Sequence, residues 1–407
     1  MILKPLKLFP QATAGNSVGR RWMHRIIANP IPATFMRGGT SKGIFLSRAS
    51  LPEARAEWDP IFLGIMGSPD PVHGRQLNGM GGGISSLSKI CVVGPPSPDK
   101  LAEGIHVEYT FVQVGIRDSS IDYSGNCGNL SSMIGVYALD EGICSASSAT
   151  IRDGRATIRS FNTNTQKVID TTFPVSDLGV ADLDVPEATV AGVPGKASEI
   201  ILDFVKPGGA RTGRLLPTGS PSDTINIPGL THSVQVSCVD ATNPTIFVRQ
   251  SDLENTFPIN EYYNQSPAAE QVVSPILESL RQTCAVRMGL DPTAQAQPKI
   301  ALLAPPAGAA DVDQSVDVTI HALSMGVLHK AVPMTVGLCL GVAAKIPGTI
   351  AWDIVQSTRT AKNDDLTRIR HPGGYVDVGA EFDGEGSVLS AKVVRTGRRL
   401  MRGVVWW

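Results

Sequence analysis

Short runs of alternating apolar and polar residues fill most of the chain, and Gly, Pro, Asn and Asp separate them. Alternation with a period of two is typical of strands that bury one face. The pattern therefore predicts a β-rich protein, with many short strands over 149–250 and at the C-terminal end. The clearest strand segments are 31–50, which holds two strands and a Gly turn, 84–94, 106–116, 243–249, 299–304 and 315–322.

Four segments have a helical pattern instead: 52–66, 267–290, a segment that starts near 128, and 324–348. The last two are almost entirely apolar, and a helix that is apolar on all sides is buried. Each of them follows a strand and a Gly-containing turn within β-rich sequence. The pattern predicts an α+β fold of two similar halves, each with a central helix wrapped by β-sheet. Both helix N-termini would face one cleft between the halves.

We expect the first half to span 31–235 and the second half 236–385, with a C-terminal strand region, 386–407, that packs back on the first half. Residues 1–30 form a basic leader, because no acidic residue precedes Glu53. An acid-poor, Arg-bearing leader is typical of a mitochondrial transit peptide, although prolines within it interrupt any amphipathic helix. A cytoplasmic protein with a disordered basic tail is the expectation, and a mitochondrial location is the alternative.

Composition excludes several classes of protein. Hydrophobic residues make up 42% of the 407 residues, which is enough for a large core, and the net charge of −1 argues against a nucleic-acid partner. The longest apolar run without a charge, 331–344, is too short for a membrane-spanning helix of about 20 residues. Six cysteines without a CxxC pair indicate free thiols rather than a zinc site or a disulfide scaffold.

The strongest local motif is SGNCGN, Ser124–Asn129, at the predicted start of the first apolar helix. Its glycines let a ligand approach the backbone closely, and the free N–H groups of a helix's first turn bind carboxylates. Cys127 stands where these groups stabilise a thiolate. Such a thiolate can act as a general base towards a carbon acid. The alternative is a Gly-rich turn around a buried structural cysteine.

Lys89 is the second candidate, because it follows several serines within a mostly apolar β pattern. A lysine in such a strand must find an anion or lose its proton. It would act as an acid or as a clamp for a carboxylate, and the alternative is an exposed lysine on a strand.

Residues 37–43, RGGTSKG, offer Arg37, Thr40 and Ser41 beside backbone amides, as an anion-binding turn does. The turn is not a P-loop, no GxGxxG follows a strand, and no two histidines form a close metal pair. We therefore expect no nucleotide cofactor and no metal.

The roles of His329 and of the C-terminal basic residues are each open to two interpretations. His329 is expected in the first turn of the second apolar helix, where a structural histidine is the alternative. The C-terminal bases either form a solvated strand or send one arginine into the cleft to pair with a substrate carboxylate, and they are Lys392, Arg395, Arg398, Arg399 and Arg402.

RGGTSKG, the SxSK motif that ends at Lys89, SGNCGN and SMGxxH (324–329) follow one another in this order. With VDATNPTIFV (239–248) and TGRRLMRG (396–403), these motifs make the chain resemble the PrpF family over about 31–403. Members of this family are cofactor-independent isomerases of unsaturated di- and tricarboxylates, such as 2-methylaconitate, methylitaconate, aconitate and 4-oxalomesaconate. The resemblance implies a diaminopimelate-epimerase-like fold with the active site in the cleft between the halves.

Residue by residue, the resemblance implies that Cys127 and Lys89 are catalytic. It implies a substrate-binding role for residues of four motifs: Arg37, Thr40, Ser41, Ser85, Ser86, Asn126, Gly128, Asn129, Ser324, Met325, Gly326 and His329. The epimerases of this fold place a second cysteine at the start of the second-half helix. Here that stretch reads SMGVLH, and the nearest cysteine, Cys339, lies further along. This departure disfavours a racemase with two thiols.

The expected activity is therefore a double-bond shift, or a cis–trans change, in an unsaturated polycarboxylate by proton transfer, without a cofactor. The alternatives are a 4-oxalomesaconate-type keto–enol tautomerase, an amino-acid racemase or epimerase, and a non-catalytic carboxylate-binding protein. The expected partner is a small polycarboxylate, with neither nucleic acid nor membrane, and a homodimer is left open.

Overall fold

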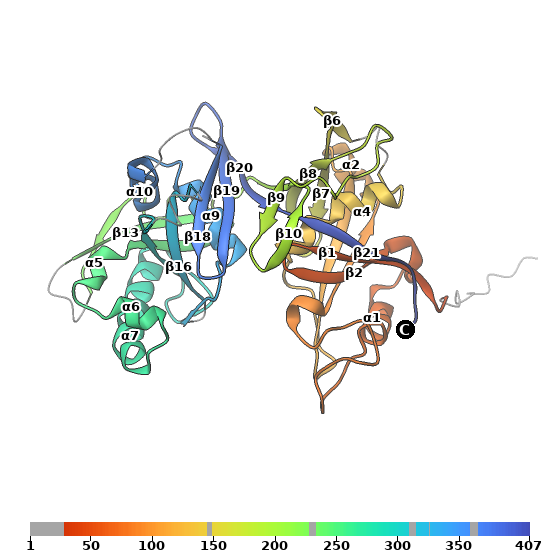
Figure 1. Cartoon of the computed structure of the whole chain (residues 1–407), viewed down its shortest axis with the longest axis horizontal. Coiled ribbons are helices and arrows are strands. Elements are labelled where there is room, and N and C mark those ends of the chain that lie inside the picture. Colours follow the sequence, from red (N-terminus) through yellow and green to blue (C-terminus); the bar gives the residue numbers. More distant parts are fainter. Residues whose placement is uncertain (1–27, 145–148, 228–232, 309–314, 325, 359–364) are drawn as a thin grey trace, which may run out of the picture.

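The computed structural model describes residues 28–144, 149–227, 233–308, 315–324, 326–358 and 365–407 (Figure 1). The predicted leader falls almost entirely outside the described residues, and so does Met325. No helix among the residues described combines the length and the apolarity that a bilayer span requires.

One half of the molecule is built from the N-terminal strands, which are drawn in red to yellow-green in Figure 1. In the order of their pairing, its main strands are β1 (Ile31–Gly38), β2 (Ser41–Ser47), β3 (Lys89–Gly94), β4 (Val107–Val114), β7 (Arg155–Asn162), β8 (Lys167–Pro174) and β11 (Ile200–Val205). Shorter elements border them: β5 (Ile121–Asp122), β6 (Thr150–Arg152), β9 (Ala188–Val190), β10 (Val193–Ala197), α1 (Trp58–Met66) and α2 (Pro98–Ala102).

The other half follows the same plan. Its strands are β12 (Asp223–Ile225), β13 (Val234–Ala241), β14 (Asn243–Arg249), β15 (Lys299–Ala304), β16 (Val318–Ser324), β17 (Val327–Leu328), β18 (Leu366–His371), β19 (Gly374–Phe382) and β20 (Val388–Arg395). Among the described residues, four helices lie outside this sheet: α5 (Ser251–Glu254), α6 (Ile259–Tyr263), α7 (Pro267–Arg287) and α10 (Ile350–Thr358).

The C-terminal strands join the two halves. β20 pairs with β19 on one side and with β11 on the other, so that one sheet continues from half to half. β21 (Gly397–Val405) then crosses to the N-terminal half and pairs antiparallel with β1 (Figure 1). The last two strands therefore place C-terminal residues beside the first turn of the chain.

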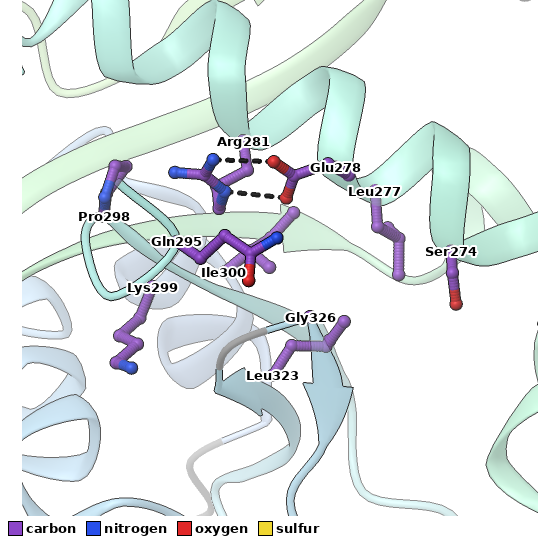
Figure 2. Close-up of a pocket in the computed structure, with 10 residues that line it drawn as sticks. All are labelled: Ser274, Leu277, Glu278, Arg281, Gln295, Pro298, Lys299, Ile300, Leu323 and Gly326. Carbon is purple, nitrogen blue, oxygen red and sulfur yellow. Dashed lines mark hydrogen bonds and ion pairs between the residues drawn. The ribbon is translucent and has the colours of Figure 1, made fainter. Parts of the chain in front are cut away.

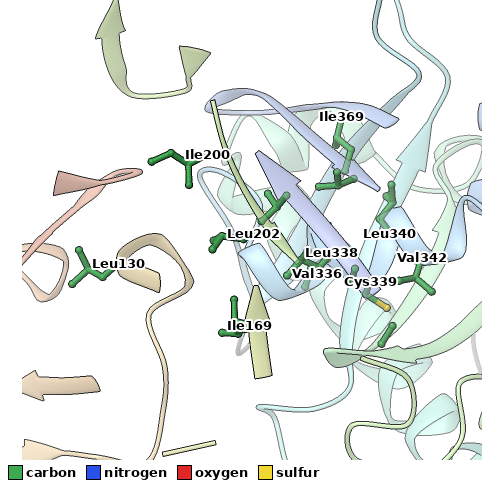
Figure 3. Packing of buried hydrophobic residues seen from close by; sticks show 14 of the residues in the cluster. Leu130, Ile169, Ile200, Leu202, Val336, Leu338, Cys339, Leu340, Val342 and Ile369 are labelled. Atoms are coloured by element: carbon green, nitrogen blue, oxygen red, sulfur yellow. The ribbon is translucent and has the colours of Figure 1, made fainter. Parts of the chain in front are cut away.

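Each half encloses a central helix. In the first half this helix is α3 (Gly128–Ser131) followed by α4 (Ile134–Asp140), and in the second half it is α9 (Met334–Ala343). A helix without a polar face can be stable only when sheet surrounds it, and α9 is buried from Val336 onwards. One apolar cluster runs from the first central helix through β8 and β11 to α9 (Figure 3). This arrangement confirms the predicted α+β, diaminopimelate-epimerase-like fold.

Two expectations about these helices are wrong in detail. The apolar segment 324–348 is not one helix, because Gly326, with φ +74°, turns the chain back so that Leu328 pairs with Leu323. Pro333 has no N–H group, so the helix begins only after it. His329 therefore lies between β17 and α9, not in a first helical turn.

The first central helix is also interrupted. Its break falls at Ser132 and Met133, between α3 and α4. The Ser131 hydroxyl donates to the Cys127 carbonyl, and the Ser132 hydroxyl donates to the Asn129 carbonyl. Serine side chains that bond to carbonyls of the preceding turn compete with the helical ladder and bend it.

The other predicted elements match with shifted ends. The segment 52–66 becomes a 3₁₀ turn, Arg55–Glu57, and α1, and 267–290 becomes α7. The strand predicted over 84–94 begins only at Lys89, because Ser85–Leu87 forms a 3₁₀ turn.

Candidate active site

A cleft of about 450 Å³ opens at the start of α3. It contains most of the residues that the first-half motifs predicted: Thr40, Ser41, Ser85, Ser86, Lys89, Asn126, Cys127, Gly128 and Asn129. The structure adds Phe111, Gln113, Asp122, Gly125 and Met334 to its lining. Cys127 and Lys89, from two motifs 38 positions apart, thus share one cleft.

Cys127 is the residue that caps α3. Its backbone is extended, its carbonyl accepts the first helical bond from the Ser131 N–H at 2.9 Å, and its side chain is half-buried. The Sγ atom lies 3.7 Å from the Ser41 Oγ atom. The first amide N–H groups of α3 have no acceptor within the helix, and Gly128 and Asn129 bring this turn to the cleft. A thiol is therefore placed beside backbone donors that favour an anion.

Lys89 is the first residue of β3 and is buried except for 9% of its surface. Its Nζ atom donates to the Oε1 atom of Gln113 and lies 5.0 Å from the centre of the Phe111 ring. No carboxylate pairs with Lys89 in the part of the chain that the structure describes. A lysine without a counter-ion at a cleft is suited to bind an anion or to transfer a proton.

Asn126 holds the loop before Cys127 in place. Its amide Nδ2 donates to the Ser131 hydroxyl at 3.1 Å, and its Oδ1 accepts from the Tyr109 hydroxyl at 3.1 Å. Burial raises the pKa of Tyr109, which keeps the phenol protonated and able to donate. The loop geometry is therefore fixed from within the sheet.

Asn129 links the first-half turn to the C-terminal strand. Its Nδ2 donates to the Thr40 hydroxyl at 3.1 Å, and its Oδ1 accepts from the Nε of Arg395, also at 3.1 Å. Arg395 ends β20 and is 9% exposed. Burial lowers the pKa of Arg395 to about 10, and the nearby charge of Cys127 opposes this shift.

The structure distinguishes Arg395 from the other C-terminal bases. Lys392 pairs with Glu381 at 3.1 Å, Arg399 pairs with Asp140 at 2.6 Å, and Arg402 pairs with Glu141 at 3.0 Å. Among the residues described, neither Arg395 nor Arg398 has a carboxylate partner, but Arg398 is exposed whereas Arg395 is buried. A buried guanidinium without an acid is suited to pair with an anion, although Arg395 is not among the residues that line the cleft. From the sequence, Arg395 could be recognised only as one member of a group of five basic residues.

His371 lies near Arg395 and was not among the residues predicted from the sequence. It ends β18 with 7% of its surface exposed, and its Nδ1 atom accepts from the Gly373 N–H at 3.1 Å. Burial and, to a smaller extent, the charges of Arg395 and His329 lower the pKa of His371 to about 4. Arg395 and His329 therefore each lie near His371, although the three residues come from separate segments. With Nδ1 as acceptor, the neutral imidazole carries its proton on Nε2.

Other predicted residues lie elsewhere. The Arg37 guanidinium donates to the Gly39 carbonyl at 2.9 Å and to the Thr396 carbonyl at 3.0 Å, so it ties the first-half turn to the junction between β20 and β21 and does not line the cleft. Ser324 ends β16, whereas Met325 lies outside the described residues. His329 does not line the cleft, but it is near His371.

Gly326 faces a separate small cavity between α7 and β15 (Figure 2). The cavity measures about 20 Å³, which is enough for about one water molecule. The Arg281 guanidinium beside it already has partners within the protein. It pairs with Glu278 at 2.6 Å and donates to carbonyls of the loop 292–297. We interpret this cavity as part of the packing of α7.

Met334, the first residue of α9, closes the cleft from the second half. A Cβ atom placed on Gly128 would lie 2.1 Å from the Met334 Sδ atom, so the two helix starts touch through a glycine. Any larger residue at position 128 would require the Met334 side chain to move. The two helix N-termini thus meet at one place, as predicted.

The chain is similar to known proteins over most of its length. The model of the family described as "PrpF protein" matches residues 28–407. The 3-methylitaconate isomerase of Eubacterium barkeri is 35% identical over 394 residues, which cover 92% of this chain and 97% of that protein. The 2-methyl-aconitate isomerase of Shewanella oneidensis is 35% identical over 398 residues, covering 92% and 96%.

A solved structure described as methylitaconate-delta-isomerase is 35% identical. It superposes with a TM-score of 0.79 and covers 93% of this chain and 95% of that one. The match includes both halves and the C-terminal strands that join them. The chain belongs to the PrpF family.

Proposed function

We propose that this protein is a cofactor-independent isomerase that moves the C=C bond of an unsaturated di- or tricarboxylate by proton transfer. The observation that carries the proposal is the placement of Cys127 and Lys89 in one cleft, beside the first turn of α3. The names of the PrpF relatives, which are isomerases of methylitaconate and methylaconitate, support the same class of substrate.

The chemistry follows from the acidity of the substrate. A C–H bond that is both α to a carboxylate and allylic loses its proton to a positioned base, and Cys127 as thiolate is that base. The electrons of the C–H bond form a dienolate, whose charge the α3 amides and nearby cations stabilise. Lys89 returns a proton to the far carbon of the allyl system, and the double bond has shifted. Solvent then exchanges protons with both side chains and restores them.

The second half favours this reaction over racemisation. A two-base racemase needs a base at the start of the second central helix, where Met334 stands. Cys339 lies within α9, fully buried, and its thiol donates to the Val239 carbonyl. Burial raises the pKa of Cys339 to about 12, so it is a poor thiolate. An oxalomesaconate-type tautomerase uses the same groups on a keto acid and is the second candidate.

Proton NMR in heavy water tests the proposal. The purified protein would be incubated with cis-aconitate, trans-aconitate, itaconate and 2-methylaconitate in separate samples. We expect new alkene signals and deuterium at allylic carbons with at least one of these acids. Oxalomesaconate would be added next, and deuterium uptake there would identify the tautomerase.

Two variants serve as controls in that experiment. Cys127→Ser and Lys89→Met should each remove most of the exchange while the circular dichroism spectrum stays unchanged. Exchange by Cys127→Ser at the wild-type rate would falsify the assignment of the base. No exchange with any of the acids by the wild-type protein would favour a protein that binds carboxylates without converting them.

A further inference from the structure

Gln113 faces Lys89 across the β3–β4 pair. The two residues are direct cross-strand partners, and Lys89 donates from Nζ to the Gln113 Oε1 atom. Two residues before Gln113, Phe111 lies on the same face of β4, and its ring packs beside the ammonium at 5.0 Å. The lysine is thus held on one side by an amide oxygen and on another by an aromatic face.

The orientation of the Gln113 amide is fixed by its other end. The Nε2 group donates to the Ser88 carbonyl at 3.0 Å and to the Ser85 carbonyl at 3.2 Å. These two bonds use both N–H bonds of the amide, so the oxygen has to point towards Lys89. The Ser88 hydroxyl is in turn bonded to the Gln76 side chain at 2.6 Å and is fully buried.

Gln113 therefore connects two parts of the cleft. One part is the Nζ atom of Lys89, and the other is the 3₁₀ turn that carries Ser85 and Ser86 to the same cleft. Any movement of the amide would displace both. A misplacement of about 1 Å at a reacting group can lower a rate by about 100-fold.

The charge of the acceptor matters as much as its position. Gln113 is neutral, so Lys89 keeps a hydrogen-bond acceptor without a counter-ion. A carboxylate at this place would hold the ammonium form, since an opposite charge within a few ångströms favours ionisation. The titratable groups around Lys89 are Cys91 on the same strand, Cys127, and Asp122, whose Oδ1 already accepts the Ser124 N–H.

We propose that Gln113 is a positioning residue, a neutral acceptor that directs the Lys89 amine into the cleft and leaves its proton free to transfer. The proposal rests on the proposed function for the meaning of that proton transfer. The geometry of the Lys89–Gln113 contact can nevertheless be tested without any substrate.

The first test measures the amine directly. Competitive acylation with acetic anhydride at a series of pH values, read by mass spectrometry, gives the reactivity of Lys89 in the wild type, Gln113→Glu and Gln113→Leu. In Gln113→Glu we expect the pH at which Lys89 becomes reactive to rise by about one to three units. An unchanged pH dependence in Gln113→Glu would overturn the proposal, whether or not a substrate has been found.

The second test uses the substrate that the NMR experiment identifies. Gln113→Leu should lower kcat by about 100-fold while KM changes less than about threefold. Gln113→Glu should move the alkaline limb of the pH profile upwards, and a profile equal to that of the wild type contradicts the proposal. Failure of every acid in the NMR experiment removes the proposed function, but it leaves the acylation result standing.

Gln76→Met is the matched control. This change removes a partner of Ser88 and loosens the same turn, but it does not touch the Lys89 amine. We expect its acylation profile to keep the wild-type pH dependence. If Gln76→Met shifts the profile as Gln113→Glu does, the turn rather than the acceptor controls Lys89, and the proposal is wrong. Thermal melting of each variant checks that it is folded.

Discussion

Cys127 stands at the start of α3, whereas Met334 follows Pro333 at the start of α9. Both positions belong to central helices enclosed by sheet, and the two helix starts touch at Gly128. The first is polar and open to the cleft, with Ser41, Lys89 and Asn129 around it. The second brings a thioether, which neither accepts nor donates a proton in water. The two similar halves therefore differ in the chemistry of the residue at the start of the central helix.

This difference indicates how the work is divided. In the proposed mechanism, the first half supplies the groups that transfer protons, and the second half supplies Met334, which covers them. The second half also contributes a positive charge. Its strand β20 ends at Arg395, whose guanidinium donates to the Asn129 side chain. Pairs of residues with similar chemistry but different surroundings test this division.

The largest effect should come from the two cysteines of the central helices. Cys127→Ala should lower kcat by about 10²–10⁴-fold, because it removes the base and leaves the fold intact. Cys339→Ala should leave kcat within about twofold but lower the free energy of unfolding by about 1 kcal/mol or more, because it removes a buried sulfur. Steady-state kinetics and denaturant unfolding of both variants check this. Equal losses of activity would mean that both halves contribute a thiol.

The next effect concerns the stability of the second half in acid. His371 has a pKa of about 4 in the folded protein against 6.5 for an ordinary histidine. As the pH falls from about 6.5 to 4, the unfolded chain takes up a proton here and the folded protein does not. The free energy of unfolding should therefore fall by roughly 3 kcal/mol through this residue.

His371→Asn keeps an acceptor for the Gly373 N–H but cannot titrate. Urea unfolding at pH 7 and pH 4 should show a smaller loss of stability in this variant than in the wild type. His73, which is exposed, offers the control His73→Asn, with the wild-type loss expected. The same loss in all three proteins would show that His371 does not resist protonation.

Two arginines of the C-terminal strands should differ by about one order of magnitude or more. Arg395→Met should lower kcat/KM by about 10- to 100-fold, the effect of removing one charge-assisted hydrogen bond. Arg399→Met breaks the pair with Asp140 at the end of α4 and should change stability more than kcat/KM. Initial rates and thermal melting distinguish the two. A larger kinetic loss in Arg399→Met would contradict the selection of Arg395.

The smallest effect should be a change of preference. Met334→Ala enlarges the cleft opposite Gly128, and one methylene of difference in a pocket is worth about 1–3 kcal/mol. The ratio of kcat/KM for 2-methylaconitate to that for aconitate should rise by about tenfold. Met334→Leu, similar in volume, should keep the wild-type ratio. An unchanged ratio in Met334→Ala would mean that the methyl group of the substrate lies elsewhere.

Much of the fold could be predicted from the sequence because its signals are local. The alternation of β1 to β4, the apolar α9 and the SGNCGN turn can all be read within a few residues of one another. The ends of α9 could not, because Val327 and Leu328 suit a strand and a helix equally well. The turn at Gly326 and the missing N–H group of Pro333 decided between them.

For the candidate site, the residues predicted from the first-half motifs line the cleft except for Arg37, whereas Gly326 and His329 of the second-half motif do not. Ser41, Lys89 and Cys127 come from three motifs that the sheet brings into one cleft. Gly326 lines a separate cavity. His329 does not line the cleft but lies near His371. The catalytic and substrate-binding roles of the predicted residues of both halves remain predictions.

The sequence by itself determined the two central helices, the sheet around them and the thiol at a helix start, since period and turn chemistry are properties of neighbouring residues. Only the tertiary structure decided which arginine is buried without an acid, which residue faces Lys89, and what stands opposite Cys127. Arg395, Gln113 and Met334 carry no local signal, because their roles depend on partners brought close by strand register and by the crossing of β20 between the halves. Such partners are far apart in the sequence, so they become buried neighbours only when the sheet has formed.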